Sequence, residues 1–247
     1  MSFLDPEFWT ALLKIIGVNI VLSGDNAVVI ALAARSLHGR QQKQAIFWGS
    51  GAAIVLRIVL TLFAVALLSL PWLKLVGGAA LLWIGVKLLV PEDEDPDIKS
   101  SDNLWIAIRT ILVADLIMSL DNVIAVAAAA GGHWVLMIIG LAISIPIVVF
   151  GATLLVKVME RWPVIITIGA GLIGFVAGEM GWEDLAIEGF TKGFPPEMKY
   201  VTAAIGAAFV IVMGRIVVGR SLKEAEEERM KSGPGRTSSP KSANTGG

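Results

Sequence analysis

The chain has 247 residues, of which 55% are hydrophobic and only 17% are charged, whereas soluble domains usually carry about 25% charged residues. Its formal net charge is −1, so it has no basic excess for binding nucleic acid, and it contains no cysteine, which excludes disulfides, thiolate metal sites and cysteine nucleophiles. The apolar residues lie in long runs separated by short charged segments, which indicates a bundle of membrane helices.

Seven segments are long enough to cross about 30 Å of hydrocarbon at about 1.5 Å per residue. We predict these spans at residues 8–34, 43–70, 73–90, 103–130, 133–157, 163–180 and 199–219. The first is expected to be a retained span rather than a signal peptide, because residues 1–7 contain Asp5 and Glu7 but no basic residue. The sequence therefore predicts an all-α membrane protein with seven transmembrane helices.

Lysine and arginine set the expected orientation, because basic residues concentrate in cytoplasmic loops. With the N-terminus outside the cell membrane, the cytoplasmic side receives Arg35, Arg40, Lys43, Lys87, Lys99, Lys157, Arg161, Arg215 and Arg220. The opposite side receives only Lys74, Lys192 and Lys199. We therefore expect a cytoplasmic C-terminus. Residues 91–102 would form an acidic cytoplasmic linker, residues 181–198 an extracytoplasmic loop, and the polar residues 221–247 a disordered cytoplasmic tail.

A repeated motif links the first and the fourth predicted spans. Ser23-Gly24-Asp25-Asn26 and Ser119-Leu120-Asp121-Asn122 share Ser-x-Asp-Asn at a shift of 96 positions, and the same shift aligns Asn19 with Asp115. Weaker matches follow, with Gly51 over Gly140 and Gly77 over Gly169. Each copy, residues 8–90 and residues 103–180, holds three predicted spans. Because three is odd, the second copy would enter the membrane from the opposite side, as an inverted repeat, and the seventh span falls outside it.

Charged side chains inside the predicted spans point to a polar site. A carboxylate at the centre of a bilayer costs about 2.5–3.5 kcal/mol. We therefore expect Asp25, Asp115, Asp121 and Arg57 to face one another or a wet cavity near the midplane. The predicted metal ligands are Asp25, Asn26, Asp121, Asn122, Asp115 and Asn19, supported by Ser23, Ser119, Gly24 and Arg57. All six ligands offer oxygen, which Mn²⁺, Mg²⁺ and Ca²⁺ prefer, and the ligand type does not separate these three ions.

The geometry of a regular helix constrains this ligand set. Asn19, Ser23 and Asn26 share one helix face, whereas Asp25 lies about 100° away from Asn26. Both Asp25 and Asn26 would reach one ion if the helix unwinds around Ser23-Gly24-Asp25, and Gly24 permits such a break. The second copy has Leu120 in that place, which leaves a symmetric break there open.

Several alternative interpretations stay open. Intramembrane Asp and Asn side chains also hold helices together without binding an ion, and Arg57 fits a structural counter-charge better than a gate. The glycines of the third and sixth predicted spans are expected to allow close helix packing. Alternative functions are an assembly factor with a structural metal site, a Ca²⁺/H⁺ exchanger, and an intramembrane aspartyl protease that uses Asp25 and Asp121 as a dyad. The protease is disfavoured because the chain lacks the expected Gly-x-Gly-Asp pattern, so we do not expect an enzyme.

The duplicated motif, the seven predicted spans and the acidic linker resemble the TerC family of integral membrane proteins, in its YjbE-like branch, over about residues 8–220. This family is grouped with the LysE-type transporters. The resemblance implies export of divalent metal ions, with Mn²⁺ as the transported substrate and no permanently bound cofactor. It also implies that Asp25 and Asp121 are the metal-binding acids, with Asn26 and Asn122 beside them. The expected partners are the metal ion and the lipid bilayer, and the sequence leaves open whether the chain forms a homo-oligomer.

Overall fold

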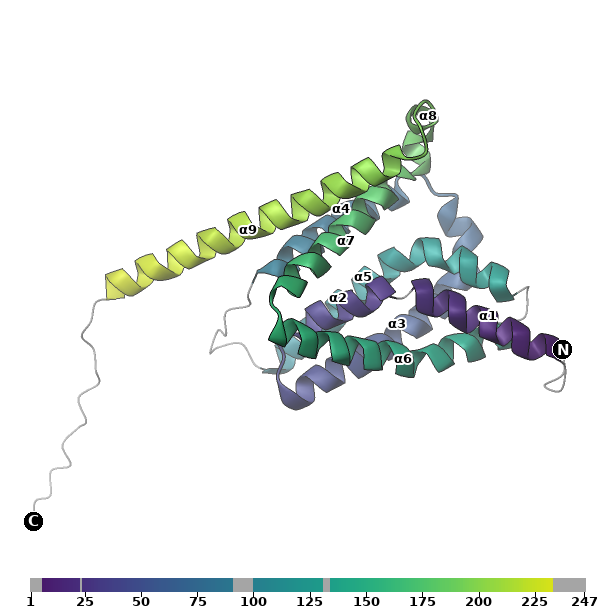
Figure 1. Ribbon diagram of the computed structural model, residues 1–247, viewed down its shortest axis with the longest axis horizontal. Helices are drawn as coiled ribbons and strands as arrows, with labels where there is room; N and C mark the ends of the chain where they lie inside the picture. The colour runs from purple at the N-terminus through teal and green to yellow at the C-terminus, as the bar shows by residue number, and fades with distance from the viewer. Residues whose placement is uncertain (1–5, 23, 91–99, 131–133, 233–247) are drawn as a thin grey trace, which may run out of the picture.

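The computed structural model describes residues 6–22, 24–90, 100–130 and 134–232, and these residues form helices joined by short turns (Figure 1). The helices are α1 (Pro6–Leu22), α2 (Gly24–Ala34), α3 (Gly39–Leu68), α4 (Leu73–Leu89), α5 (Ser100–Ala130), α6 (Trp134–Arg161), α7 (Val164–Trp182), the 3-10 turn η1 (Leu185–Ile187), α8 (Glu188–Thr191) and α9 (Met198–Ser232). The all-α class predicted from the apolar runs is therefore confirmed for the described part of the chain.

Fewer helices of the described part meet both a length and a hydropathy requirement for crossing a membrane than the seven spans that the sequence predicts. Among the described residues, α3, α5, α6, α7 and α9 are long and apolar enough to cross a membrane, and α1 with α2 adds a sixth span if this bent pair counts as one. The third predicted span corresponds to α4, which has only 17 residues. That length is at the lower end of the roughly 17–25 residues that cross a bilayer.

The helices form two groups that lie side by side (Figure 1). One group contains α4, α7 and α9, and the other contains α1, α2, α3, α5 and α6. The most extensive contacts join α7 to α9, α3 to α5 and α4 to α7, and α6 packs against both α1 and α2. Contacts of α2 with α7 and of α4 with α5 join the two groups.

Apolar side chains fill the space between these helices and also cover the outside. Leu32, Leu81, Ile111 and Ile173 come from four different helices and are at most 1% exposed within one continuous core. Large apolar side chains such as Phe150 are exposed on the outer surface. An apolar core inside an apolar surface is the arrangement expected of an integral membrane protein, since the surrounding lipid is itself apolar.

Glycines bring α7 and α9 into backbone contact. A Cβ atom placed on Gly206 would collide with the carbonyl oxygen of Gly174, and one on Gly178 would collide with the carbonyl oxygen of Thr202. On α4, a Cβ on Gly78 would lie 2.8 Å from the carbonyl oxygen of Ala177. Small residues permit this close approach in membranes, so the packing role expected for the glycines of the third and sixth spans is confirmed at these positions.

The C-terminal part of α9 corrects one prediction. The sequence predicts that the last span ends at residue 219 and that residues 221–247 are disordered, but α9 continues to Ser232. Residues 222–231 are rich in Leu, Lys, Glu, Ala and Arg, which are strong helix formers, so the helix continues past the membrane. Residues 233–247 lie outside the described residues. Similarly, α5 begins at Ser100, inside the predicted linker 91–102, and residues 91–99 lie outside the described part.

Asp184 ties the end of α7 to the turn before α4. Its carboxylate is 1% exposed and accepts the backbone N–H groups of Trp72 and Leu75 at 2.9 Å and of Ala186 at 2.7 Å. Trp72, with φ of 70°, precedes α4, so Asp184 caps this helix from 112 positions away. Burial alone would raise the pKa of Asp184, but the N–H donors hold this pKa below its ordinary value.

Candidate functional site

The first copy of the motif lies at a helix break. α1 ends at Leu22, α2 begins at Gly24, and the axes of Phe8–Asn19 and Gly24–Ala34 differ by 49° (Figure 1). The second copy lies within α5, which is one helix from Ser100 to Ala130. A Cβ on Gly24 would meet no atom within 4 Å, so packing does not require glycine here. Gly24 has no positive φ either, so the structure shows the break at this copy without requiring glycine there.

The break places the beginning of α2 at the first copy of the motif. Asp25 lies in the first turn of α2 and is half-buried, and its Oδ1 accepts the backbone N–H of Asn26 at 2.8 Å. The positive end of the helix dipole favours a carboxylate at this place. The last carbonyl groups of a helix generally lack intrahelical partners, and such carbonyls are suitable ligands for a cation.

Arg57 on α3 connects both copies of the repeat. Its Nη1 donates to Asn19 Oδ1 at 2.7 Å, its Nη2 donates to Asp115 Oδ1 at 2.7 Å, and its Nε donates to Ser119 Oγ at 3.0 Å. The Ser119 hydroxyl in turn donates to Asp115 Oδ2 at 3.2 Å. All four side chains are buried, so the positive guanidinium and the negative carboxylate balance each other's charge inside the protein.

A cavity of about 10 Å³ lies beside this network. Its polar wall is formed by Asn19, Asn26, Ser50, Arg57 and Asp115, and its apolar wall by Ile30, Ala53, Ile54 and Val148. This volume is close to the minimum of about 10–15 Å³ that holds one water molecule. The cavity is therefore matched in size to one small ligand.

Two polar side chains in the cavity wall lack a protein partner. Within the described residues, neither the amide oxygen nor the amide nitrogen of Asn26 makes a hydrogen bond, and the Ser50 hydroxyl makes none. Asn26 is 2% exposed and Ser50 is 1% exposed. A buried polar group without a partner costs about 1–3 kcal/mol, so such groups indicate a place where a bound ligand supplies the missing contact.

The structure brings some predicted ligands together and leaves others apart. Asn19 and Asn26 line the same cavity although the break between α1 and α2 separates them, and Asp115 joins them from α5. Asp25 is half-buried but is not part of the cavity wall. Asn122 is 9% exposed on α5. The side chain of Asp121 and the whole of Ser23 lie outside the described residues.

Sequence reasoning missed Ser50. A lone serine in an apolar span carries little signal, but Ser50 stands seven residues before Arg57 and therefore shares its helix face. Among the residues whose side chains are described, no three His, Asp or Glu side chains gather as a metal cluster. An ion at the cavity would thus depend on amide, hydroxyl and backbone oxygens as well as on carboxylates, so the metal-binding role of the predicted residues stays a prediction.

Relatives of the chain are membrane proteins. The uncharacterized membrane protein YjbE of Bacillus subtilis (strain 168) is 46% identical over 177 residues, which are 72% of this chain and 81% of YjbE. The uncharacterized membrane protein YkoY of the same strain is 28% identical over 212 residues, which are 75% of this chain and 65% of YkoY. The UPF0053 inner membrane protein YoaE of Escherichia coli (strain K12) is 27% identical over 232 residues, but the chain spans only 43% of its length. No solved structure matches the chain.

The family assignment covers nearly all of the described structure. The model of the integral membrane protein TerC family matches residues 4–226, which include both copies of the motif, the broken first span and the Arg57 network. The similarity to YjbE agrees with the YjbE-like branch that the motif predicts. The chain therefore belongs to the TerC family of integral membrane proteins.

Proposed function

We propose that this protein is a secondary transporter that exports a divalent metal ion, Mn²⁺ first, through an Asp/Asn site between two inverted repeats of three spans each. The observation that carries the proposal is the buried side-chain amide of Asn26. This amide lines a cavity next to Arg57 and Asp115 and makes no hydrogen bond within the described residues. Hard divalent ions bind oxygen ligands of this kind.

The contacts between helices support the inverted repeat. In this repeat, the broken span α1–α2 corresponds to α5, α3 corresponds to α6, and α4 corresponds to α7. A two-fold axis then requires that, if α3 contacts α5, α6 contacts α1 and α2, and these contacts are present. The same axis converts the α4–α5 contact into the α2–α7 contact, and all of these pairs touch. The α4–α7 and α2–α5 contacts convert into themselves, as contacts across a two-fold axis do. α9 remains outside the repeat as a seventh span.

Side-chain packing supports the same correspondence. A Cβ on Gly49 would meet Ile111 Cδ1 at 2.8 Å, and a Cβ on Gly140 would meet Ile15 with similar tightness. Ile15 and Ile111 are separated by the 96 positions that separate the two motifs. The packing favours Gly49, rather than the Gly51 of the sequence alignment, as the counterpart of Gly140.

Arg57 gives the proposed site its asymmetry. It binds Asn19 and Asp115, which are counterparts of each other in the two copies. The same sequence offset that relates Gly49 to Gly140 makes Val148 the counterpart of Arg57. Arg57 and Val148 both line the cavity. Only one copy therefore supplies a tethered cation, which neutralises Asp115. In the proposed mechanism, Asp25 and Asp121 are the acids that remain to balance a doubly charged ion.

The proposed direction of transport requires an energy source. Moving a 2+ ion out of a cell against an inside-negative potential costs about 4.6 kcal/mol per 100 mV, twice the value for a single charge. We propose exchange for protons, because a proton and a metal ion compete for the same carboxylate. Asp115 is paired with Arg57, so Asp25 is a better candidate for carrying the proton than Asp115. The N-out, C-in orientation from the basic loops places metal entry on the cytoplasmic side.

Manganese uptake into proteoliposomes tests the proposal. The wild type is compared with an Asp25→Ala, Asp121→Ala double variant, with Ca²⁺ and Mg²⁺ as competing ions. A Glu188→Ala, Glu197→Ala double variant removes two exposed acids and serves as the matched control. We expect uptake by the wild type and the control and none by the Asp25, Asp121 variant. A wild type without uptake, or a fully active Asp25, Asp121 variant, would mean that these aspartates are structural.

A further inference from the structure

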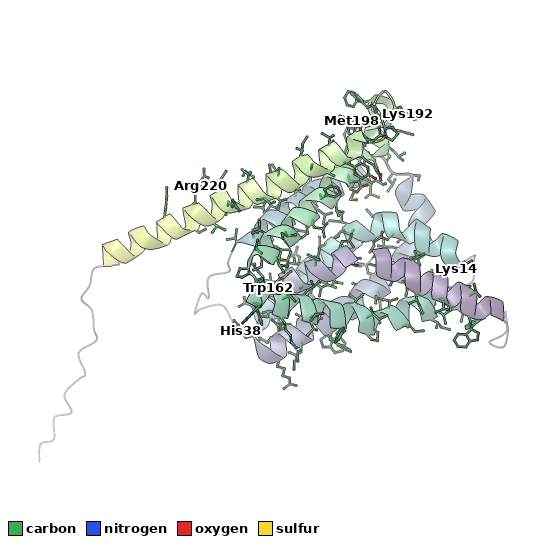
Figure 2. The ribbon with its side chains drawn as sticks, viewed as in Figure 1. Lys14, His38, Trp162, Lys192, Met198 and Arg220 are labelled. Carbon is green, nitrogen blue, oxygen red and sulfur yellow. The ribbon has the colours of Figure 1, made fainter. Side chains whose placement is uncertain are left out.

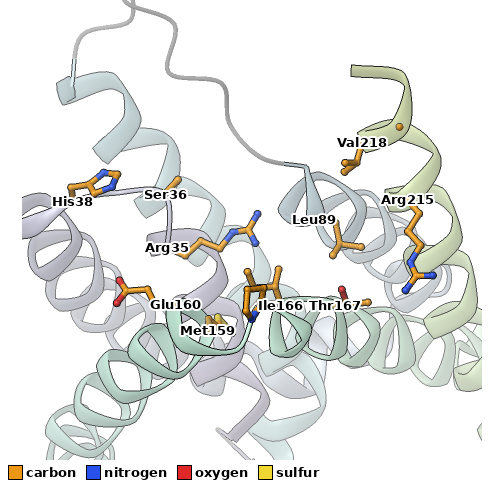
Figure 3. A pocket seen from close by; sticks show the side chains of 13 residues that line it. Arg35, Ser36, His38, Leu89, Met159, Glu160, Ile166, Thr167, Arg215 and Val218 are labelled. Carbon is orange, nitrogen blue, oxygen red and sulfur yellow. The ribbon is translucent and has the colours of Figure 1, made fainter. Parts of the chain in front are cut away.

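A second cavity, of about 720 Å³, lies where the α2–α3 turn, the α6–α7 turn, the end of α4 and the outer part of α9 meet (Figure 3). It shares no lining residue with the cavity beside Arg57. Its volume falls within the roughly 300–1,000 Å³ of sites that bind small molecules. The proposed transport does not use it.

The 720 Å³ cavity, which we call the headgroup cavity, lies at the ends of several helices. α6 ends at Arg161, α7 begins at Val164, α4 ends at Leu89 and α3 begins at Gly39, so four helix ends border it. Trp162 is 57% exposed at the same end, and exposed tryptophan favours the depth of the lipid headgroups. Figure 2 shows His38 and Trp162 at this end of α7, and Lys192 and Met198 at the other.

The charges of the headgroup cavity favour an anion. Arg35 and Arg215 lie on two sides of it, with Leu89, Ile166 and Thr167 between them (Figure 3). Arg35 Nη2 donates to the carbonyl oxygen of Val90 at 3.5 Å, which orients this guanidinium. Among the described lining residues, Glu160 is the one acid, and the beginning of α7 adds the positive end of a helix dipole.

Part of the remaining wall is apolar. Leu89, Met159, Ile166 and Val218 line the cavity between the two arginines. A ligand that fits this surface has an anionic head and a hydrocarbon chain. Basic pockets between transmembrane helices at the membrane surface recognise the headgroups of anionic lipids.

We propose that the headgroup cavity binds one anionic phospholipid, whose phosphodiester lies between Arg35 and Arg215 and whose acyl chain runs along the apolar wall. The site is independent of the metal-transport proposal. It concerns the leaflet at the Arg35 end of the spans, which is the cytoplasmic leaflet in the N-out orientation.

Native mass spectrometry of the delipidated protein tests this site. The probes are phosphatidylglycerol and phosphatidylcholine with the same acyl chains. An Arg35→Gln, Arg215→Gln variant is compared with an Arg40→Gln, Arg220→Gln control, which removes two exposed arginines outside the cavity lining. The wild type and the control are expected to prefer phosphatidylglycerol. Two arginines near an anionic lipid raise the binding affinity roughly thirtyfold, so the Arg35, Arg215 variant is expected to bind phosphatidylglycerol more weakly by about that factor.

Two further arms complete the test. Thr167→Trp keeps both arginines but fills the cavity, and it is expected to lose phosphatidylglycerol as well, so it carries the test if the double variant does not fold. Inorganic phosphate is expected not to displace the lipid, and displacement would assign the site to free phosphate and overturn the lipid proposal. Equal retention of both lipids by the wild type, or control-like binding by the Arg35, Arg215 variant, would also overturn it.

Discussion

Arg57 Nη2 lies 2.7 Å from Asp115 Oδ1, and the two side chains are only 3% and 6% exposed. The residues are 58 positions apart and belong to α3 and α5, so their ion pair joins the first predicted three-span unit, residues 8–90, to the second, residues 103–180. Both side chains are shielded from bulk water and from lipid, so a single charge would be poorly solvated there. The pair therefore fixes how the two copies meet, and each partner depends on the other.

Replacement of Arg57 by Gln is expected to destabilise the protein by about 3–5 kcal/mol, because it leaves the Asp115 carboxylate buried without its counter-charge. The free energy of unfolding in detergent measures the effect. Arg109→Gln removes an exposed arginine from α5 and is the control, with an expected change within about 0.5 kcal/mol.

A double variant, Arg57→Met with Asp115→Leu, tests the same pair from the other side. It removes both charges together, so we expect it to be more stable than Arg57→Gln or Asp115→Asn alone. Single variants as stable as Arg109→Gln would show that the ion pair does not hold α3 against α5.

The pH dependence of stability is expected to report Asp184. Its pKa lies below the ordinary value of 3.8, so the ionised carboxylate stabilises the folded protein above about pH 4, and this contribution is lost as the pH falls through the folded pKa. Asp184→Asn is expected to lower stability at pH 7 by about 1.5–3 kcal/mol, the value of hydrogen bonds to a charged group. Unfolding measured between pH 7 and pH 3 should show a smaller acid loss for Asp184→Asn than for the wild type.

The control for Asp184 is Glu197→Gln, which removes an exposed acid from the same loop region and should keep the wild-type pH profile. If Asp184→Asn followed the wild type through the acid range, the capping contacts to Trp72 and Leu75 would not contribute to stability.

The contact between α7 and α9 is expected to exclude even one methyl group at Gly206. A Cβ there collides with the backbone of Gly174, so Gly206→Ala should separate the helices and lower the melting temperature. Gly219→Ala lies on the same helix, where a Cβ meets no atom within 4 Å, and should be neutral or stabilising. A thermal melt of both variants distinguishes them, and equal melting temperatures would contradict the close packing.

The sequence predicts the parts of this structure that depend on local patterns. The apolar runs locate the helices, and Gly24 marks a place where the first span can break, as it does between α1 and α2. An arginine inside a span requires a counter-charge, so the pairing of Arg57 with an aspartate was also predictable, but three aspartates satisfied that requirement equally. Only the packing of α3 against α5 selects Asp115.

Long-range contacts account for what the sequence missed. Asp184 caps α4 from 112 positions away, and nothing near it in the chain signals that role. Ser50 joins the cavity only because α3 turns the face of Arg57 toward α1 and α2. The helical end of α9 was missed for a different reason, since a charged and polar segment suits a solvated helix as well as a disordered tail.

Manganese flux through an Asn26→Leu variant tests the central claim most directly. Leucine has a similar size and removes an amide that makes no hydrogen bond within the described residues, so stability is expected to stay the same or to rise by about 1–3 kcal/mol. If the amide is an ion ligand, this folded variant should transport Mn²⁺ at least about tenfold more slowly than the wild type, a loss of about 1.4 kcal/mol. Wild-type flux from a folded Asn26→Leu protein would contradict the account, because the cavity beside Arg57 would then not be the path of the ion.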